Sequence, residues 1–240
     1  MERRLGYLNH RELKDLVPEK IDTVLLPVGT VEAHGVIPLG TDILIPEALA
    51  ERLSEALDAL VAPAIPYGIT RGLYGHPGTV FITPQTFKSY VADVMASLAK
   101  TGFDKIVVIN GHGGQIVELQ DAIFDASKTS NVKTLLVNWW IGMEDLCKQN
   151  LEREGGHAGA DETAAVMAID PAFVRKNLYD EGMTVRQTPT FRAYPFPGTI
   201  ITYAEGDGRL NFDRARCEAY FNAVVARLSG TIKDILSRWE

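Results

Sequence analysis

Short apolar runs alternate with longer amphipathic segments along the chain, a pattern typical of βα units around a largely parallel sheet. Strands are predicted where β-branched or apolar residues cluster, at Thr23–Val28, Leu60–Ile65, Gly78–Ile82, Lys105–Asn110 and Val132–Trp139. Pro63 interrupts the second run, which favours a position near an edge of the sheet. Helices are predicted at Ile43–Leu57, Pro84–Lys100, from after Gly114 to about Ser127, Ala160–Ile169 and Phe212–Arg238.

No repeat, low-complexity tract or flexible linker divides the chain, so we expect a single α/β domain over residues 1–240, with helices flanking the sheet. An apolar content of 46% and a charged content of 23% are ordinary for a globular protein. The net charge of −7 gives no reason to expect nucleic acid or an anionic membrane as a partner. No run approaches the ~20 apolar residues that span a bilayer. The first residues lead into a polar stretch, and we therefore expect a cytoplasmic protein without a signal peptide.

Most of the histidines lie in short glycine-containing loops, and three of these loops also carry or adjoin carboxylates. The loops are Gly29–Gly35 with Thr41-Asp42 just beyond, Asn110–Gly114, and Gly156–Thr163. Glycine permits tight turns and a close approach of a ligand to the backbone. The first two loops follow predicted strands, whose carboxyl ends share one rim of a parallel sheet. We therefore expect side chains that are distant in sequence to meet there.

The chemistry of these side chains favours a metal site. Glu32 and His34 are separated by one residue, so in an extended segment their side chains point the same way. Imidazole and carboxylate without sulfur suit Zn, Mn or Fe. The nitrogen and oxygen ligands available exceed what one tetrahedral zinc needs, which favours two divalent ions per chain bridged by a carboxylate.

Each candidate also has a structural alternative. Asp42 precedes a predicted helix and is able to cap it. Gly111–Gly114 is able to cradle a phosphate at a helix start, although it lacks the P-loop Lys-Ser/Thr and the dinucleotide spacing. Glu162 at the start of a helix suits the helix dipole. His76, between Gly75 and Pro77, is a candidate substrate-loop residue. No Gly-x-Ser-x-Gly sequence is present and neither cysteine neighbours a histidine, which disfavours a serine or cysteine hydrolase.

At these residues the chain resembles the creatininase (creatinine amidohydrolase) family. The resemblance runs through Pro27–Gly35, Leu39–Asp42, Pro77–Thr79, Asn110–Gly114, and His157–Gly159 with Glu162-Thr163. It implies a single α/β domain of creatininase-like fold, a dinuclear metal site and a homo-oligomer, often a hexamer. It also implies that Glu32, His34, Asp42 and His112 are metal ligands, with Asp42 bridging. By the same resemblance His157 handles the proton.

Two positions depart from creatininase itself. The family's enzyme has a glutamate ligand where this chain has Gly114, and we expect Glu162 to supply that carboxylate instead. The tryptophan that covers creatinine in that enzyme is replaced here by residues of the Arg153–Gly156 stretch. Trp139 and Trp140 are the candidates to line the pocket in its place, with simple packing at a strand end as the alternative. Gly113, Gly114 and His76 are further substrate-binding candidates. We therefore do not expect creatinine to be the substrate.

The resemblance implies a metal-dependent amidohydrolase in which metal-activated water attacks a C–N bond of a small cyclic amide or formamide. One alternative is a metal-dependent hydrolase that opens a cyclic ketone or lactone of carbohydrate origin. A second alternative is a non-catalytic sugar-phosphate or nucleotide-binding domain. The loops Gly68–Gly78 and Arg186–Gly198 are expected to shape the pocket. Arginines that could anchor an anionic substrate are Arg71, Arg153, Arg186, Arg192 and Arg209.

Overall fold

The computed structural model describes residues 1–187, 193, 194, 196 and 200–239. Its main sheet is parallel throughout, with the strand order β2-β1-β3-β4. The strands are β1 (Thr23–Val28), β2 (Ala59–Val61), β3 (Lys105–Asn110) and β4 (Lys133–Asn138). A separate parallel pair consists of β5 (Thr184–Arg186) and β6 (Ile201–Tyr203). The predicted α/β class and the parallel sheet are confirmed, and the strand containing Leu60 lies at an edge.

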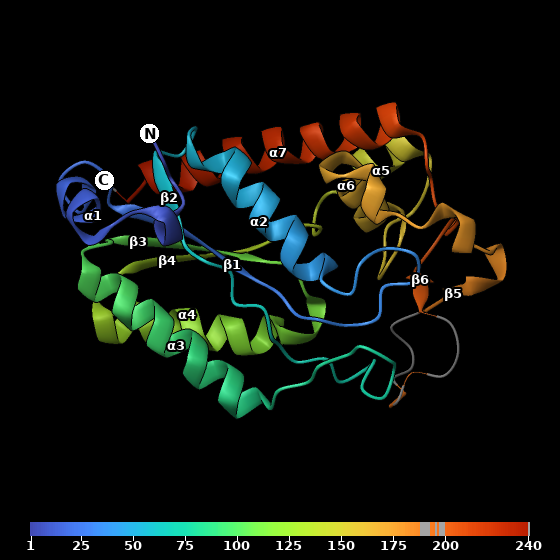
Figure 1. Ribbon diagram of the computed structural model, residues 1–240, viewed down its shortest axis with the longest axis horizontal. Coiled ribbons are helices and arrows are strands. Elements are labelled where there is room, and N and C mark those ends of the chain that lie inside the picture. Colours follow the sequence, from blue (N-terminus) through green and yellow to red (C-terminus); the bar gives the residue numbers. More distant parts are fainter. Residues whose placement is uncertain (188–192, 195, 197–199, 240) are drawn as a thin grey trace.

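Helices cover both faces of the main sheet (Figure 1). The α-helices are α1 (His10–Leu16), α2 (Thr41–Ser54), α3 (Pro84–Thr101), α4 (Ile116–Ser130), α5 (Glu144–Leu151), α6 (Ala160–Ile169) and α7 (Arg214–Ser237). Five short 3₁₀ segments lie at Leu5–Tyr7, Gly113–Gln115, Pro171–Phe173, Lys176–Leu178 and Glu181–Met183. Within the described residues, no helix is both long and apolar enough to cross a bilayer.

Alternation along the buried strands divides the core into two layers. Leu25 of β1 belongs to the layer formed with α2, α5, α6 and α7. Val24 and Leu26 belong to the opposite layer, formed with α3 and α4. Because successive strand side chains point to opposite faces, a fully apolar strand supplies both layers at once.

One predicted strand is wrong. Gly78–Ile82 forms no strand, and its sheet-like contact is limited to an isolated bridge between Phe81 and Gly68. Gly78 has a φ of 84°, in the left-handed region, and this interrupts an extended segment. The second strand is also shorter than predicted, because it ends at Val61, two residues before Pro63.

The strand order places a topological switch point between β1 and β3. From β1 the chain crosses to β2 on one side, and it then returns to place β3 on the other side. In open parallel sheets, ligands bind outside the carboxyl ends of the strands at such a point. The loops that follow Val28 and Asn110 leave the sheet there.

Candidate metal centre

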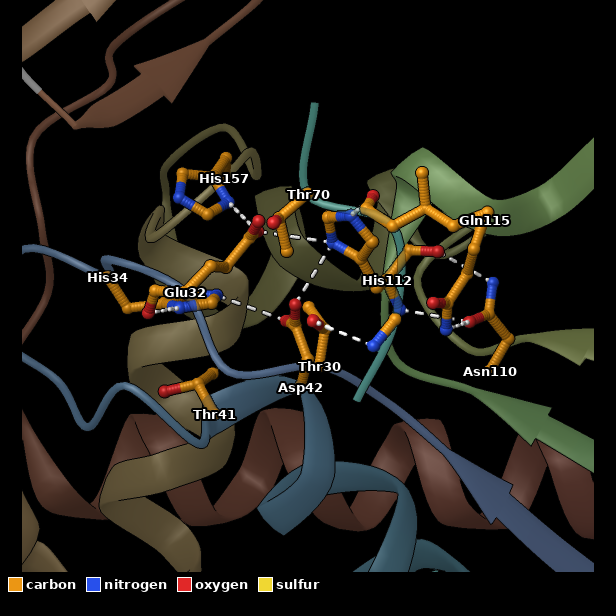
Figure 2. Close-up of polar contacts among 12 residues, drawn as sticks. Thr30, Glu32, His34, Thr41, Asp42, Thr70, Asn110, His112, Gln115 and His157 are labelled. Atoms are coloured by element: carbon orange, nitrogen blue, oxygen red, sulfur yellow. Dashed lines mark hydrogen bonds and ion pairs between the residues drawn. The ribbon is translucent and has the colours of Figure 1, made fainter. Parts of the chain in front are cut away.

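Four segments bring the six candidate site residues together at the carboxyl ends of β1 and β3. The loop after β1 carries Glu32 and His34, and the first turn of α2 carries Asp42. His112 follows β3, while His157 and Glu162 lie just before and within the first turn of α6. Figure 2 shows the Glu32 and Asp42 carboxylates and the three imidazoles directed toward one another.

Asp42 lies between two histidines. Its Oδ1 is 3.0 Å from His34 Nε2, and its Oδ2 is 3.0 Å from His112 Nδ1. The carboxylate is only 2% exposed, and Oδ2 lacks a partner with hydrogen-bond geometry. The helix-cap alternative is wrong, because Gly40 is the N-cap of α2 and Asp42 sits inside the first turn.

Glycines hold Asp42 against the sheet. Gly29 follows β1 and Gly111 follows β3, and a Cβ at either position would overlap the backbone carbonyl of Asp42. A side chain at either glycine would therefore push the first turn of α2 away from the strand ends. Because glycine has no Cβ, Gly29 and Gly111 allow the backbone of Asp42 to lie close to the ends of β1 and β3.

Two further carboxylates complete the cluster. Glu32, 1% exposed, places Oε1 3.1 Å from His112 Nδ1 and 3.4 Å from His157 Nδ1. Glu162 Oε2 lies 3.6 Å from His34 Nε2 and accepts a hydrogen bond from Ala158 N at 2.7 Å. Glu162 is therefore oriented into the cluster as well as lying at the start of a helix.

The other nitrogen of each imidazole faces a backbone carbonyl. His34 Nδ1 is 3.0 Å from Glu32 O, His112 Nε2 is 3.0 Å from Ile69 O, and His157 Nε2 is 2.9 Å from Ala33 O. A carbonyl oxygen only accepts, so each of these nitrogens carries the hydrogen. When the ring is neutral, its second nitrogen therefore presents a lone pair to a carboxylate oxygen. The nitrogen and the oxygen repel each other unless a cation lies between them. This fixed tautomer is the arrangement of metal-ligating histidines.

The carboxylates of the cluster favour positive charge on the groups beside them. Burial alone would lower the pKa of His34, but the charges of Asp42, Glu162 and Glu32 raise that pKa to about 10. The pKa of His112 is likewise raised well above its ordinary value, because Glu32 and Asp42 outweigh its burial. Without metal ions, protons on these two rings therefore supply the missing positive charge.

His157 differs from the other two histidines. Burial and the neighbouring charge of His34 lower the pKa of His157 to about 4, so its ring is neutral at pH 7. The centroids of these two rings are 4.5 Å apart. A neutral imidazole with a free lone pair is able to accept a proton.

Three overlapping sets of side chains have the composition and spacing to hold a cation. In each set the ligand atoms lie within 4.8 Å of one another. The sets are Glu32 with Asp42 and His112, His34 with Asp42 and Glu162, and Glu32 with His34 and His157. The donor atoms fit borderline divalent metals, and the buried, unpartnered Asp42 Oδ2 is the kind of atom such an ion satisfies.

Two cavities that share lining residues open onto the cluster. The larger, about 490 Å³, is lined by Glu32, His112 and His157, and the smaller, about 310 Å³, by Asp42, Glu162 and Trp140. Gly113 and Gly114 line both cavities. Three of the predicted substrate-binding residues therefore lie at the site: Gly113, Gly114 and Trp140. Trp139 instead packs in the core, fully buried, and lines neither cavity.

His76 lies at neither cavity wall within the described part of the chain. Its Nε2 is 3.4 Å from the carbonyl oxygen of Phe196, which itself lines the larger cavity. Of the two loops expected to shape the pocket, the first contributes Arg71, Gly72 and Leu73. The second contributes Gln187, Ala193, Tyr194 and Phe196, while its residues 188–192, 195, 197 and 198 lie outside the described residues.

Amide side chains that the sequence pattern did not indicate hold His112 in place. Asn110 Oδ1 accepts from His112 N at 3.0 Å and from Gln115 Nε2 at 3.0 Å. Asn110 Nδ2 donates to His112 O at 2.8 Å and to Asn138 Oδ1 at 2.7 Å. Figure 2 shows Asn110 and Gln115 beside His112. The available signal was an asparagine at the end of two apolar strands, where a polar side chain needs a specific partner.

Proteins similar to this chain include sequence relatives and a solved structure. The sequence model of a family described as "Creatininase: Creatinine amidohydrolase" matches residues 6–232. A mycofactocin precursor peptide peptidase of Mycolicibacterium smegmatis is 36% identical over 245 residues, covering 98% of this chain and 91% of the relative. A 3-dehydro-scyllo-inosose hydrolase of Thermotoga maritima is 31% identical over 190 residues, covering 73% of this chain but only 60% of that relative's length. A solved structure described as "Creatininase Mn" has a TM-score of 0.77 at 25% identity, covering 98% of both chains.

Proposed function

Because the chain belongs to the creatininase family, we propose that it is a dinuclear-metal-dependent hydrolase acting on a C–N bond of a small cyclic amide or formamide. The observation that carries the proposal is the orientation of the three histidines. Each ring donates to a backbone carbonyl through one nitrogen and faces a cluster carboxylate with the other. For His34 and His112, which the proposal assigns as ligands, this is the usual orientation of metal-ligating histidines.

Two divalent ions account for the ligand sets. One would be held by Glu32, Asp42 and His112, and the other by His34, Asp42 and Glu162, since Asp42 belongs to both sets. Three carboxylates alone would leave three buried negative charges, which two divalent ions neutralise with one positive charge to spare. Zn, Mn and Fe all suit this donor set, and the similarity to a structure described as a manganese form supports Mn among them.

Residues of the chain itself would transfer the proton and shape the cavity. The bound ions supply Lewis acidity, which lowers the pKa of water and polarises a carbonyl group. His157 lines the larger cavity, and its Nδ1 carries no hydrogen in the tautomer set by the Ala33 carbonyl, so it would accept a proton from the attacking water and pass it to the leaving nitrogen. Gly114 lets the backbone pass close to His112, because a Cβ there would overlap the imidazole ring, and Gly113 adds no side chain to either cavity.

The names of the relatives support a hydrolase but differ in the type of bond that is cleaved. The peptidase named above acts on a peptide, as its name states, and this favours a C–N bond here. The inosose hydrolase favours the second candidate, in which the same cluster opens a cyclic ketone or lactone of carbohydrate origin. Amide, formamide, cyclic-ketone and lactone substrates tested side by side on the metal-loaded protein separate the two. The oligomeric state implied by the family resemblance stays a prediction, to be measured by light scattering.

The deciding experiment counts metal ions in gently purified protein by elemental analysis. We expect about two Zn, Mn or Fe ions per chain in the wild type, and loss of both metal and turnover in Asp42→Asn. Asp145→Asn is the matched control, because Asp145 pairs with Arg227 at 2.6 Å and lies in neither cluster cavity. Wild-type protein that takes up no metal from solutions of any of the three ions would overturn the proposal. It would instead favour the non-catalytic sugar-phosphate or nucleotide-binding domain.

A further inference from the structure

The larger cavity is lined by a positively charged residue, Arg71, that does not belong to the cluster of histidines and carboxylates. Among the described residues that line it, Arg71 is the one with a permanent positive charge. Its side chain is 45% exposed and occupies the wall beside Gly113 and Gly114. The cavity thus joins the cluster residues Glu32, His112 and His157 to a guanidinium group within one space of about 490 Å³.

Arg71 is held in place with part of its donor capacity unused. Nη2 donates to Glu118 Oε1 at 2.7 Å, and Nη1 reaches the carbonyl oxygen of Gly114 at 3.4 Å. A guanidinium has five N–H donors in a planar fork. A long contact to Gly114 leaves Nη1 available for a better acceptor, and the bond to Glu118 keeps the group oriented without using the remaining donors.

The other arginines considered as anchors are engaged elsewhere in the described structure. Arg153 and Arg209 both pair with Asp207, and Arg186 donates to the carbonyl of Ala204. None of these three lines either cluster cavity. Arg192 lies outside the described residues.

We infer that Arg71 binds an anionic group of the substrate, a carboxylate or a phosphate, while the scissile bond lies at the cluster. This rests on the proposed function, because bound cations would neutralise the buried Glu32 carboxylate that lines the same cavity and would otherwise repel an anion. Carboxylate and phosphate share the paired acceptor oxygens that match a guanidinium. Leu73, Phe196 and Ile200 also line this cavity and suit an apolar part of the same ligand.

The test uses three probes that the enzyme cannot hydrolyse at an amide: 3-phenylpropanoate, phenyl phosphate and the neutral 3-phenylpropan-1-ol. Calorimetric titration of metal-loaded wild type is expected to show tighter binding of an anion than of the alcohol. Arg71→Gln should weaken anion binding about tenfold and leave alcohol binding unchanged. The anion that depends more strongly on Arg71 distinguishes carboxylate from phosphate recognition.

Two variants sharpen the readout. Arg227→Gln is the matched control, because Arg227 also donates to a carboxylate and to a backbone carbonyl but lies in neither cluster cavity. We expect it to bind both anions as the wild type does. Glu118→Gln removes the competing carboxylate from Arg71 and should tighten anion binding.

Anion affinity that is unchanged in Arg71→Gln would overturn the inference, since the anions would then sit on the metal ions alone. A wild type that binds the alcohol as tightly as both anions would overturn it too. Failure of the proposed function looks different, because it appears as the absence of bound metal in the elemental count. Calorimetry measures probe binding in every variant, so the result does not depend on whether the protein turns over any substrate.

Discussion

The side chains of Asn110 and Asn138 are joined by a hydrogen bond of 2.7 Å across the ends of β3 and β4, where the two residues are paired in register. The same amide of Asn110 donates to His112 O, and its oxygen accepts from His112 N. The turn that carries a metal-ligand candidate is therefore fixed to the sheet by one side chain. The orientation of His112 depends on Asn110 as much as on its own contacts.

We predict that Asn110→Ala lowers metal affinity about ten- to a hundredfold, in the range found for residues that orient ligands. The measurement is a competition titration with a chelator of known affinity. Asn150→Ala is the control, because Asn150 donates to the carbonyl of Leu146 inside α5, away from the cluster. A folded Asn110→Ala protein with wild-type affinity would show that the turn holds His112 without the amide.

Glu162→Gln should remove one of the two metal ions. Glu162 contacts His34 and belongs to the set with Asp42, whereas the set around His112 does not include it. Elemental analysis should therefore fall from about two ions per chain to about one. Glu144→Gln provides the control, since Glu144 is also an acidic residue in the first turn of a helix but is exposed on α5. Retention of both ions in Glu162→Gln would remove Glu162 from the ligand set.

His157→Asn should separate chemistry from metal binding. His157 lies outside the two ligand sets assigned to the ions, so the variant should keep its metal. Its kcat should fall by about 10²–10⁴-fold, the usual range for loss of a general acid–base group. His76→Asn serves as the control, because His76 lines neither cavity in the described structure. Loss of metal from His157→Asn would indicate that His157 is a ligand instead.

The metal-free protein should lose stability as the pH rises from about 6.5 to about 10. The folded state raises the pKa of His34 from 6.5 to about 10, so the folded chain binds this proton more tightly than the unfolded chain. The stabilisation is complete below pH 6.5 and disappears as the pH rises through the folded value. Thermal melts across this range should show a falling Tm for metal-free protein. With metal bound, the ion replaces the proton and the slope attributed to His34 should vanish; an equal slope in both forms would contradict this assignment.

The sequence predicted the central strands well because their residues are buried on both faces. Thr23–Val28 and Lys105–Asn110 have the predicted bounds, and both are almost entirely buried. Such strands appear as continuous apolar runs whatever their neighbours are. Gly78–Ile82 has a similar composition but no strand beside it to complete a ladder, and composition alone cannot reveal that difference.

The short elements were missed for another reason. Helix α1 spans only His10–Leu16, but Asn9 and Glu12 form a capping box that the sequence does display. Strands β5 and β6 pair with one another and have three residues each, which is too short for a periodic pattern. Pairing between distant three-residue segments is decided by the tertiary fold and leaves little trace in the local sequence.

For the site, the sequence supplied the side chains but not their orientation. The loops and their glycines predicted that Glu32, His34 and Asp42 would meet His112, and the structure brings these side chains together. Which nitrogen of His112 faces the cluster depends on the carbonyl of Ile69, 43 positions earlier in the chain. The sequence offered five candidate arginines as an anion anchor, and of the four that the structure describes, Arg71 lines the larger cavity.

The three imidazoles are oriented by main-chain carbonyl groups at Glu32, Ala33 and Ile69. Every amino acid offers the same carbonyl, so substitution at Ala33 or Ile69 leaves the acceptor in place as long as the backbone keeps its path. The reactive centre is thus decoupled from much of the genetic variation around it. Residues on the pocket walls can therefore change without altering the acceptors that orient the three imidazoles, so a new pocket shape need not disturb the orientation of the candidate ligands.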